Sequence, residues 1–154
     1  MSKERGVYQV SLKVILKNKN GEVLVLRTKE DSSYRGENDF PGGRIDADEF
    51  DLDFMEVLSR EIKEEAGDIK FRLSPEPVSL GRHFAGAKFS RFNKDIKFFY
   101  VFFVGEYIDG EISISDEHTS YQWLKLEDIK PEDYFISGIL EGVKGYIKMQ
   151  KNIV

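Results

Sequence analysis

Apolar and polar residues alternate along the first part of the chain, and this period of two predicts a β-strand. The apolar positions of that strand are Tyr8, Val10, Leu12, Val14 and Leu16. Asn20-Gly21 follows, and because both residues tolerate positive φ the pair predicts a hairpin turn. We expect residues 23–27 to form the returning strand and the polar, turn-rich residues 29–39 to form a loop.

The period changes from two to a helical one after Asp53. Asp53 and Glu56 have the spacing of a capping box, which predicts the start of a helix. Gly67 is a typical helix stop. Between them, apolar residues recur at intervals of three and four and predict one buried stripe, made of Met55, Leu58, Ile62 and Ala66.

The second half of the chain repeats this order of strands followed by a helix. Residues 77–85, 95–108 and 121–126 predict strands, and residues 126–134 predict turns with a short helix. Helical spacing from Ile136 to Ile147 predicts a last helix, although Gly138, Gly142 and Gly145 each weaken it by about 1 kcal/mol relative to alanine. We therefore expect the α/β class, with a mixed sheet packed against helices in a single domain over residues 1–154.

The amino-acid composition restricts the classes of function that the chain can have. Of 154 residues, 40% are hydrophobic and 33% charged, which is typical of a globular protein, and the net charge of −5 disfavours broad binding to extended nucleic acid. The chain has no cysteine and two histidines, which excludes disulfides and thiolate sites and disfavours zinc. Because no segment resembles a signal peptide or approaches the roughly 20 apolar residues of a membrane span, we expect a cytoplasmic protein that does not bind membranes.

Three glutamates near the end of the first helix carry the strongest chemical signal. At about 100° per residue, Glu61, Glu64 and Glu65 fall within an arc of roughly 100° beside the buried stripe. The mutual repulsion of the three carboxylates and the helix dipole both disfavour this arrangement. A bound cation would make the electrostatic energy of the arrangement favourable. Oxygen ligands suit Mg²⁺ or Mn²⁺. A solvated acidic helix end is the alternative interpretation of the helix alone.

The loop before the helix makes this signal more specific. Its sequence "FPGGRIDADE" pairs two glycines that let the backbone approach a ligand. Together with the helix, the segment resembles the Nudix hydrolases, which include MutT. The residues that match the family's motif are Gly43, Glu49, Arg60, Glu61, Ile62, Glu64, Glu65 and Gly67.

Two departures from the family's motif qualify the resemblance. Three extra residues lie between Glu49 and Arg60, and we expect them to form a bulge within "EFDL". This leaves either Glu49 or Asp51 as the partner of Arg60. Asp68 stands where the family has an apolar residue, and we expect Ile69 to supply that apolar contact.

The resemblance implies a Nudix fold, with a mixed sheet between helices, and a magnesium-dependent hydrolase. Glu61, Glu64 and Glu65 would bind Mg²⁺, or Mn²⁺ in its place, together with a backbone carbonyl near Gly43. Arg60 would orient the three glutamates. The substrate would be a small nucleotide, either a nucleoside triphosphate or a nucleoside diphosphate linked to another group, cleaved at a phosphoanhydride bond. In the loop before residues 121–126, Glu117 is the candidate general base, with Asp116 and His118 as competitors.

Several cations are candidates for binding the substrate. Arg27 and Arg44 flank the glycine loop and are suited to phosphate contact. Arg82 opens a basic segment over residues 82–97, whose phenylalanines at 84, 89 and 92 are alternatives for stacking on a base. The alternative for this segment is a solubilised hairpin with its phenylalanines in the core.

Other interpretations of the quaternary structure and of the function also remain open. The apolar residues 95–108 allow an interface strand, and thus a homodimer. Two alternative functions on the same fold are a nucleotide-sugar glycosyl hydrolase and a non-catalytic nucleotide sensor. The intact sequence "REIKEE" argues against both.

Overall fold

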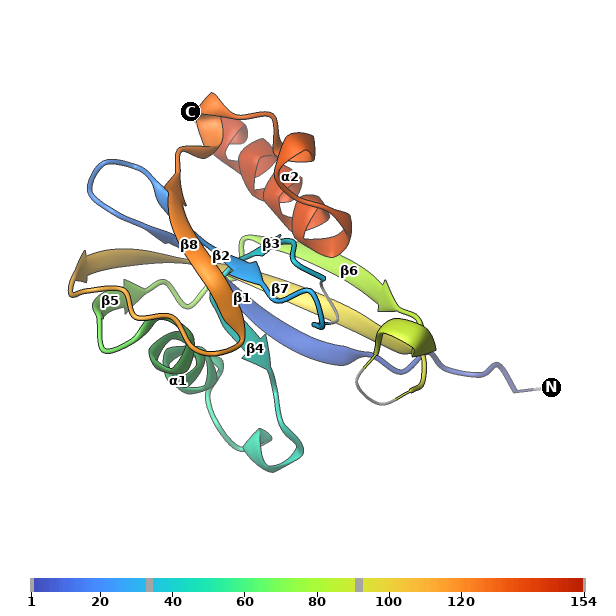
Figure 1. Ribbon diagram of the computed structural model, residues 1–154. Coiled ribbons are helices and arrows are strands. Elements are labelled where there is room, and N and C mark those ends of the chain that lie inside the picture. The colour runs from blue at the N-terminus through green and yellow to red at the C-terminus, as the bar shows by residue number, and fades with distance from the viewer. Residues whose placement is uncertain (1, 33–34, 91–92, 154) are drawn as a thin grey trace.

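A computed structural model describes residues 2–32, 35–90 and 93–153 (Figure 1). Within these residues, eight strands form one sheet. The strands are β1 (Gln9–Lys17), β2 (Val23–Thr28), β3 (Asn38–Asp39), β4 (Gly42–Arg44), β5 (Lys70–Leu73), β6 (Ser79–Ala85), β7 (Ile96–Asp109) and β8 (His118–Leu124). The two long helices are α1 (Phe54–Ala66) and α2 (Ser137–Asn152), and short 3₁₀ turns lie at η1 (Ala47–Glu49), η2 (Ala87–Phe89), η3 (Leu126–Asp128) and η4 (Pro131–Asp133).

The sheet is mixed and is built around two long central strands. β1 runs parallel to β7 along its whole length, from Gln9 opposite Phe98 to Lys17 opposite Glu106. β5 and β6 pair antiparallel with β7, while β3 and β8 pair antiparallel with β2. β1 meets β2 only where Lys17 faces Val23, and it pairs with β4 over Ser11–Lys13 instead. The two strands therefore diverge, and this divergence positions the candidate site.

One helix covers each face of the sheet, which confirms the predicted architecture (Figure 1). On one face, Leu58, Ile62 and Ala66 of α1 join a cluster with Leu12, Val14 and Leu16 of β1. On the other face, Ile139 and Val143 of α2 pack with Phe102 of β7. Among the described residues, no helix combines the length and apolar character needed to cross a membrane.

The apolar character of β7 follows from its place in the sheet. Tyr100 and Phe102 belong to the cluster under α2, and Phe103 belongs to the cluster under α1. Both faces of this part of the strand are therefore covered within one chain, as expected for a central strand flanked by helices. A subunit interface is not needed to explain its composition, and a homodimer stays a prediction.

The ends of α1 are those that the sequence predicts. Asp53 accepts a hydrogen bond from the Met55 N–H (2.7 Å), and Glu56 accepts one from the Asp53 N–H (2.8 Å). Gly67 ends the helix at φ +92°. Ile69 is buried beside α1, so it does supply the apolar contact that Asp68 does not. Three details differ: β3 lies inside the predicted loop 29–39, β5 was not predicted, and β8 begins at His118 rather than at Tyr121.

The glycines of α2 do more than weaken the helix. A Cβ on Gly142 would lie 2.0 Å from the buried ring of Phe102, and a Cβ on Gly138 would lie 2.5 Å from the Arg82 carbonyl oxygen. These glycines therefore allow α2 to approach the sheet closely.

We expect Gly142→Ala to lower the free energy of unfolding by about 1–3 kcal/mol, because overpacking outweighs the gain of about 1 kcal/mol in helix propensity. Urea denaturation followed by circular dichroism measures the change. Gly145→Ala is the matched control on the same helix, since its Cβ would meet nothing nearer than the Ser79 Cβ at 3.1 Å. An increase in stability for Gly142→Ala would contradict the packing role.

Candidate functional site

Two adjoining cavities open where β1 and β2 diverge. The first, here called the carboxylate cavity, has a volume of about 490 Å³ and is lined by Arg60, Glu61, Glu64 and Glu65 among others. The second, here called the sheet cavity, has a volume of about 370 Å³ and is lined by residues that include Lys13, Asp39, Tyr100 and His118. The residues common to both cavities are Gly43, Arg44, Glu65, Asp116 and Glu117.

Helix α1 brings the three glutamates to the carboxylate cavity. Burial of Leu58, Ile62 and Ala66 fixes the rotation of the helix, and the glutamates lie beside that stripe. Their exposure differs: the whole of Glu65 is 7% exposed, whereas the side chains of Glu61 and Glu64 are 13% and 58% exposed. The three carboxylates therefore run from the interior to the surface along one wall of the cavity.

The backbone conformation of β4 and the atoms packed against it require glycine at both of its glycine positions. Gly42 has φ +146°, and its N–H donates to Glu65 Oε2 at 2.8 Å. A Cβ on Gly42 would lie 1.9 Å from the Leu12 carbonyl oxygen, and one on Gly43 would lie 2.3 Å from the Glu61 carboxyl carbon. Only glycine at these positions lets β4 lie against both β1 and the carboxylates.

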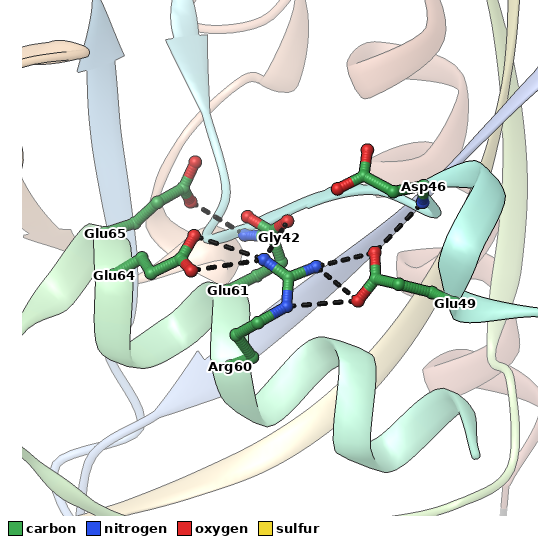
Figure 2. Close-up of polar contacts among 7 residues, drawn as sticks. All are labelled: Gly42, Asp46, Glu49, Arg60, Glu61, Glu64 and Glu65. Atoms are coloured by element: carbon green, nitrogen blue, oxygen red, sulfur yellow. Dashed lines mark hydrogen bonds and ion pairs between the residues drawn. The ribbon is translucent and has the colours of Figure 1, made fainter. Parts of the chain in front are cut away.

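Arg60 connects the carboxylates to the preceding loop (Figure 2). Its Nη2 donates to both oxygens of Glu49, at 2.8 and 2.7 Å, and its Nε donates to Oε2 at 3.1 Å. Its Nη1 lies 3.0 Å from Glu61 Oε1 and 3.2 Å from Glu64 Oε2. One guanidinium thus balances three carboxylates, and its rigid fork suits this bidentate pairing.

Glu49, and not Asp51, is therefore the partner of Arg60. Glu49 is 7% exposed and also accepts a hydrogen bond from the Asp46 N–H (2.9 Å), which caps η1. The three extra residues form an exposed turn over 50–52, closed by the Leu52 N–H to the Glu49 carbonyl (3.1 Å). Placement of the extra residues in "EFDL" is confirmed, and the alternative partner Asp51, which is exposed, is wrong.

If the carboxylates that Arg60 contacts hold a metal ion, Glu49→Gln is expected to weaken the activity that depends on that ion roughly 10–100-fold, the usual range for losing a residue that orients metal ligands. Asp51→Asn is the matched control on the same turn and should leave activity unchanged. Steady-state rates of both variants at saturating Mg²⁺ measure the difference. Equal rates for the two variants would contradict the role of Glu49.

Burial and charge set the protonation of these groups. Burial raises the pKa of Glu65 to about 8, although Lys13 and the Gly42 N–H oppose the change. Burial, helped by the charge of Glu64, also raises the pKa of Glu61, which Arg60 partly offsets. The Asp46 N–H and then Arg60 lower the pKa of Glu49. Burial alone would lower the pKa of Arg60, but its carboxylate partners outweigh burial and raise it.

The raised pKa of Glu65 predicts a pH dependence of metal binding. In the metal-free protein Glu65 keeps its proton until about pH 8, whereas in the unfolded chain it loses the proton near 4.5. The stabilisation from this proton is complete below about pH 4.5 and is lost as the pH rises through about 8. A metal ion bound by Glu65 requires the charged carboxylate, so Mg²⁺ affinity should rise as the pH approaches about 8 and level off above it.

Isothermal titration in buffers of different ionisation enthalpy measures this linkage. We expect Mg²⁺ binding to release protons near pH 7 and few at pH 9, and we expect Glu65→Gln to remove most of the difference. Proton release that does not change between these two pH values would contradict the assignment.

The donors of the carboxylate cavity fit a hard divalent cation. Glu61, Glu64 and Glu65 offer carboxylate oxygens, and the lack of a side chain at Gly43 lets the Glu61 carboxylate lie directly against the backbone of β4. Such donors suit Mg²⁺ or Mn²⁺. Within the described part of the chain, no three acidic or histidine side chains already converge as a ligand set. Arg60 holds Glu61 and Glu64, so a cation would compete with this guanidinium for them.

The sheet cavity contains a buried ion pair that we did not predict from the sequence. Lys13 Nζ lies 2.8 Å from Asp39 Oδ2, and the two side chains are 8% and 11% exposed. Burial alone would lower the pKa of Lys13, but Asp39 and Glu65 outweigh it, so the pKa is raised and the lysine stays charged. Lys13 thereby places a positive charge between Asp39 and Glu65. The sequence does contain a signal for the burial of this strand: the continuous apolar run "VIL" at 14–16 is typical of a strand that is buried on both faces.

His118 lies at the start of β8 and lines the same cavity. It is 8% exposed, and burial lowers its pKa, so its ring is neutral at pH 7. Its Nδ1 is buried and has no hydrogen-bond partner among the described residues. Among the three candidate bases, His118 lines only the sheet cavity, whereas Glu117 and Asp116 line both cavities.

The structure brings together some predicted substrate-binding residues and separates others. Arg44 lines both cavities, donates to Gln9 (2.7 Å) and lies 5.6 Å from the Phe98 ring centroid. Arg27 is exposed near the end of β2 and lines neither cavity. Arg82 is on β6, 3.6 Å from Glu141 of α2, and also lies outside both cavities.

The basic segment over 82–97 likewise lies apart from the two cavities. Phe84 and Phe89 are 57% and 45% exposed and line neither cavity, so they are not core residues as in the alternative interpretation. Phe92 lies outside the described residues. Of the candidates outside the helix and its glycine loop, only Arg44, Asp116, Glu117 and His118 share the site within the described chain.

Comparison with known proteins agrees with the motif and the fold. A family model described as the NUDIX domain matches residues 7–140. Three similar structures are the MutT protein of Methanosarcina mazei Go1 (23% identity, TM-score 0.72, 97% of each chain), an ADP-ribose pyrophosphatase of Streptococcus suis 89-1591 (16%, 0.63, 96% of each chain) and a C. elegans Ap4A hydrolase (22%, 0.61, 94% of this chain and 99% of that chain).

No match was found among curated proteins. At these identities the structural similarities show the fold, whereas the family model covers most of the chain together with its glycine loop and acidic helix. The chain therefore belongs to the Nudix hydrolase family.

Proposed function

We propose that this protein is a Mg²⁺-dependent hydrolase that cleaves a phosphoanhydride bond in a nucleoside triphosphate or in a nucleoside diphosphate derivative. One observation carries the proposal: three glutamates of one helix face, the Arg60 guanidinium that holds two of them, and Gly43 line one cavity. In support, structures with this fold are named for ADP-ribose, Ap4A and dihydroneopterin triphosphate, all of which contain a phosphoanhydride. A cytoplasmic location stays a prediction.

The residues of the chain have distinct roles in this proposal. Glu61, Glu64 and Glu65, with the backbone at Gly43, hold the cation, and Arg60 orients Glu61 and Glu64. Bound there, Mg²⁺, or Mn²⁺ in its place, supplies positive charge against the pyrophosphate and activates water. Arg44, at the boundary of the two cavities, contacts a phosphate. Glu117 lines both cavities and accepts the proton of the attacking water.

The two cavities suggest how the substrate divides between them. The pyrophosphate occupies the carboxylate cavity, which adjoins the sheet cavity along Gly43 and Arg44. The remainder of the nucleotide enters the sheet cavity, whose volume of about 370 Å³ is within the usual range for small-molecule sites. The buried Lys13–Asp39 pair lies among the residues that line it.

A panel of nucleotides and nucleotide sugars, assayed with Mg²⁺ and with a chelator, tests the proposal. We expect at least one phosphoanhydride substrate to be hydrolysed only when the metal is present. Absence of hydrolysis across the panel, or full activity in the chelator, would contradict it. Reaction in oxygen-18 water then separates the chemistries: label in the phosphate product indicates attack at phosphorus, and label in the sugar indicates a glycosyl hydrolase.

A further inference from the structure

A third cavity lies apart from the candidate functional site, and we call it the lysine cavity. Its walls come from the β1–β2 turn, from the segment that contains η3 and η4, and from the second half of α2 (Figure 1). Its volume is about 620 Å³, which exceeds that of the carboxylate cavity or the sheet cavity and is within the usual range for small-molecule sites. Among the described residues, none lines both the lysine cavity and one of the other two.

The floor of the lysine cavity is apolar. Val23, Leu126 and Tyr146 line it and are buried members of the core cluster under α2. Ile129 and Ile147 also line it, and they pack against the same cluster while staying partly exposed. The core holds these side chains in place, so they present fixed apolar surface to the cavity. A ligand with an apolar body would cover that surface and remove it from water, which favours binding.

The remainder of the lining is charged and mostly basic. Four lysines and two acids line the cavity, namely Lys17, Lys144, Lys148, Lys151, Glu127 and Glu132. Both acids already have cationic partners: Lys144 Nζ lies 2.6 Å from Glu132 Oε1, and Lys125 Nζ lies 3.5 Å from Glu127 Oε1. In the described part of the chain, no acidic side chain pairs with the other three lysines. The cavity thus has an excess of positive charge, although the net charge of the chain is −5.

The helix dipole explains only part of this positive charge. Lys148 and Lys151 lie near the C-terminal end of α2, where the dipole stabilises cations without any ligand. Lys17 is different, because it ends β1 and because its Nζ lies 5.8 Å from the centroid of the Tyr146 ring. This distance is within the range of a cation–π contact, which keeps the ammonium group beside the apolar floor. Positive charge from a strand and from a helix therefore meets at one apolar cavity.

We propose that the lysine cavity is a second binding site of this protein and that it takes a small organic anion. The apolar ring or chain of the ligand lies on the floor, and its carboxylate, sulfonate or phosphate group faces Lys17, Lys148 and Lys151. Walls from three separate segments form a compact cavity, which suits a small molecule rather than an extended peptide. No residue of the carboxylate cavity takes part, so the inference does not depend on the proposed hydrolysis.

Fluorescence titration with two matched probes tests the proposal. Anilinonaphthalene sulfonate combines an aromatic body with one fixed negative charge, and phenylnaphthylamine has the same aromatic body without the sulfonate. We expect the wild type to bind the sulfonate saturably, with one molecule per chain. Lys17→Glu/Lys148→Glu should weaken sulfonate binding at least about tenfold, because each substitution turns an attraction into a repulsion, and should change the binding of the uncharged probe by less than about twofold.

Two further variants separate the cavity from the charge of the whole chain. Lys70→Glu/Lys88→Glu is the matched control: it makes the same change in net charge at two exposed lysines that line none of the three cavities. This variant should bind the sulfonate like the wild type. Lys17→Gln/Lys148→Gln removes the two charges without reversing them, and it should weaken sulfonate binding by a smaller factor than the glutamate variant. Circular dichroism checks that all variants are folded.

Nuclear magnetic resonance identifies where the probe binds. We expect the sulfonate to shift the backbone amide signals of residues 17–23, 126–132 and 144–151, which form the walls of the lysine cavity. The amide signals of residues 60–65 and 116–118, which line the other two cavities, should stay in place.

Three results would overturn the proposal. The first is a wild type that shows no saturable binding of the sulfonate, which would leave the cavity without a ligand of this class. The second is equal affinity of Lys17→Glu/Lys148→Glu and the wild type, which would place the probe elsewhere. The third is an equal loss in Lys70→Glu/Lys88→Glu, which would mean that the net charge of the chain, and not this cavity, determines binding.

Discussion

Replacing Glu64 by glutamine is expected to lower metal-dependent hydrolysis at least about a hundredfold, which corresponds to about 2.7 kcal/mol of lost transition-state stabilisation. The substitution keeps the size of the side chain and removes one of the negative charges that would hold the cation. Because the Glu64 side chain is 58% exposed, the folded structure should tolerate the change. Rates measured with the best substrate of the nucleotide panel, over a range of Mg²⁺ concentrations, provide the test.

Glu56→Gln is the matched control for this experiment. Glu56 lies on the same helix and accepts a hydrogen bond from the Asp53 N–H at 2.8 Å, a role that glutamine can also fill. We expect this variant to retain wild-type activity. A Glu64→Gln enzyme as fast as the wild type would contradict the metal-binding role of Glu64.

Replacing Lys13 by methionine is expected to destabilise the fold by about 3–5 kcal/mol, the usual cost of leaving one member of a buried ion pair alone. Asp39 is 8% exposed, and without Lys13 its buried carboxylate would lose its ion-pair partner. Urea denaturation at pH 7 measures the free energy of unfolding.

Two comparisons separate this effect from a general loss of charge. The double variant Lys13→Met/Asp39→Asn should recover much of the stability, because it removes both buried charges. Arg72→Met breaks an exposed pair, Arg72 with Glu106 at 3.3 Å, and exposed pairs typically contribute less than about 1 kcal/mol. A Lys13→Met loss no larger than the Arg72→Met loss would contradict the importance of the buried pair.

The helix and the placement of its glutamates were predictable because their signals are local. The Asp53 cap, the Gly67 stop and the stripe through Leu58 and Ile62 depend on residues a few positions apart. The spacing of Glu61, Glu64 and Glu65 on that helix fixed their common direction. Gly43 and Glu61 could also be assigned to one site from the sequence, because the family's motif includes the glycine loop and the helix in one continuous segment.

Predictions that needed distances between separate strands were less successful. Arg27 precedes the glycine loop in the sequence, but it lines neither cavity. Arg82 belongs to a basic segment, yet it lies beside Glu141 of α2. The glycines of α2 were interpreted from helix propensity alone, whereas the contact of Gly142 with Phe102 depends on the packing of the helix against the sheet.

The sequence by itself determined the long strands and both long helices, which helix carries the carboxylates and to which family the chain belongs, because each of these depends on periodicity or on a contiguous motif. Only the tertiary structure decided that Glu49 pairs with Arg60 despite three extra residues, and that Lys13 meets Asp39 across 26 positions of the chain. The physical reason is that ion pairing depends on distance in space. The divergence of β1 from β2 and the path of the turn at 50–52 set those distances. The motif spacing indicated where the extra residues lie, but not which carboxylate they leave facing Arg60.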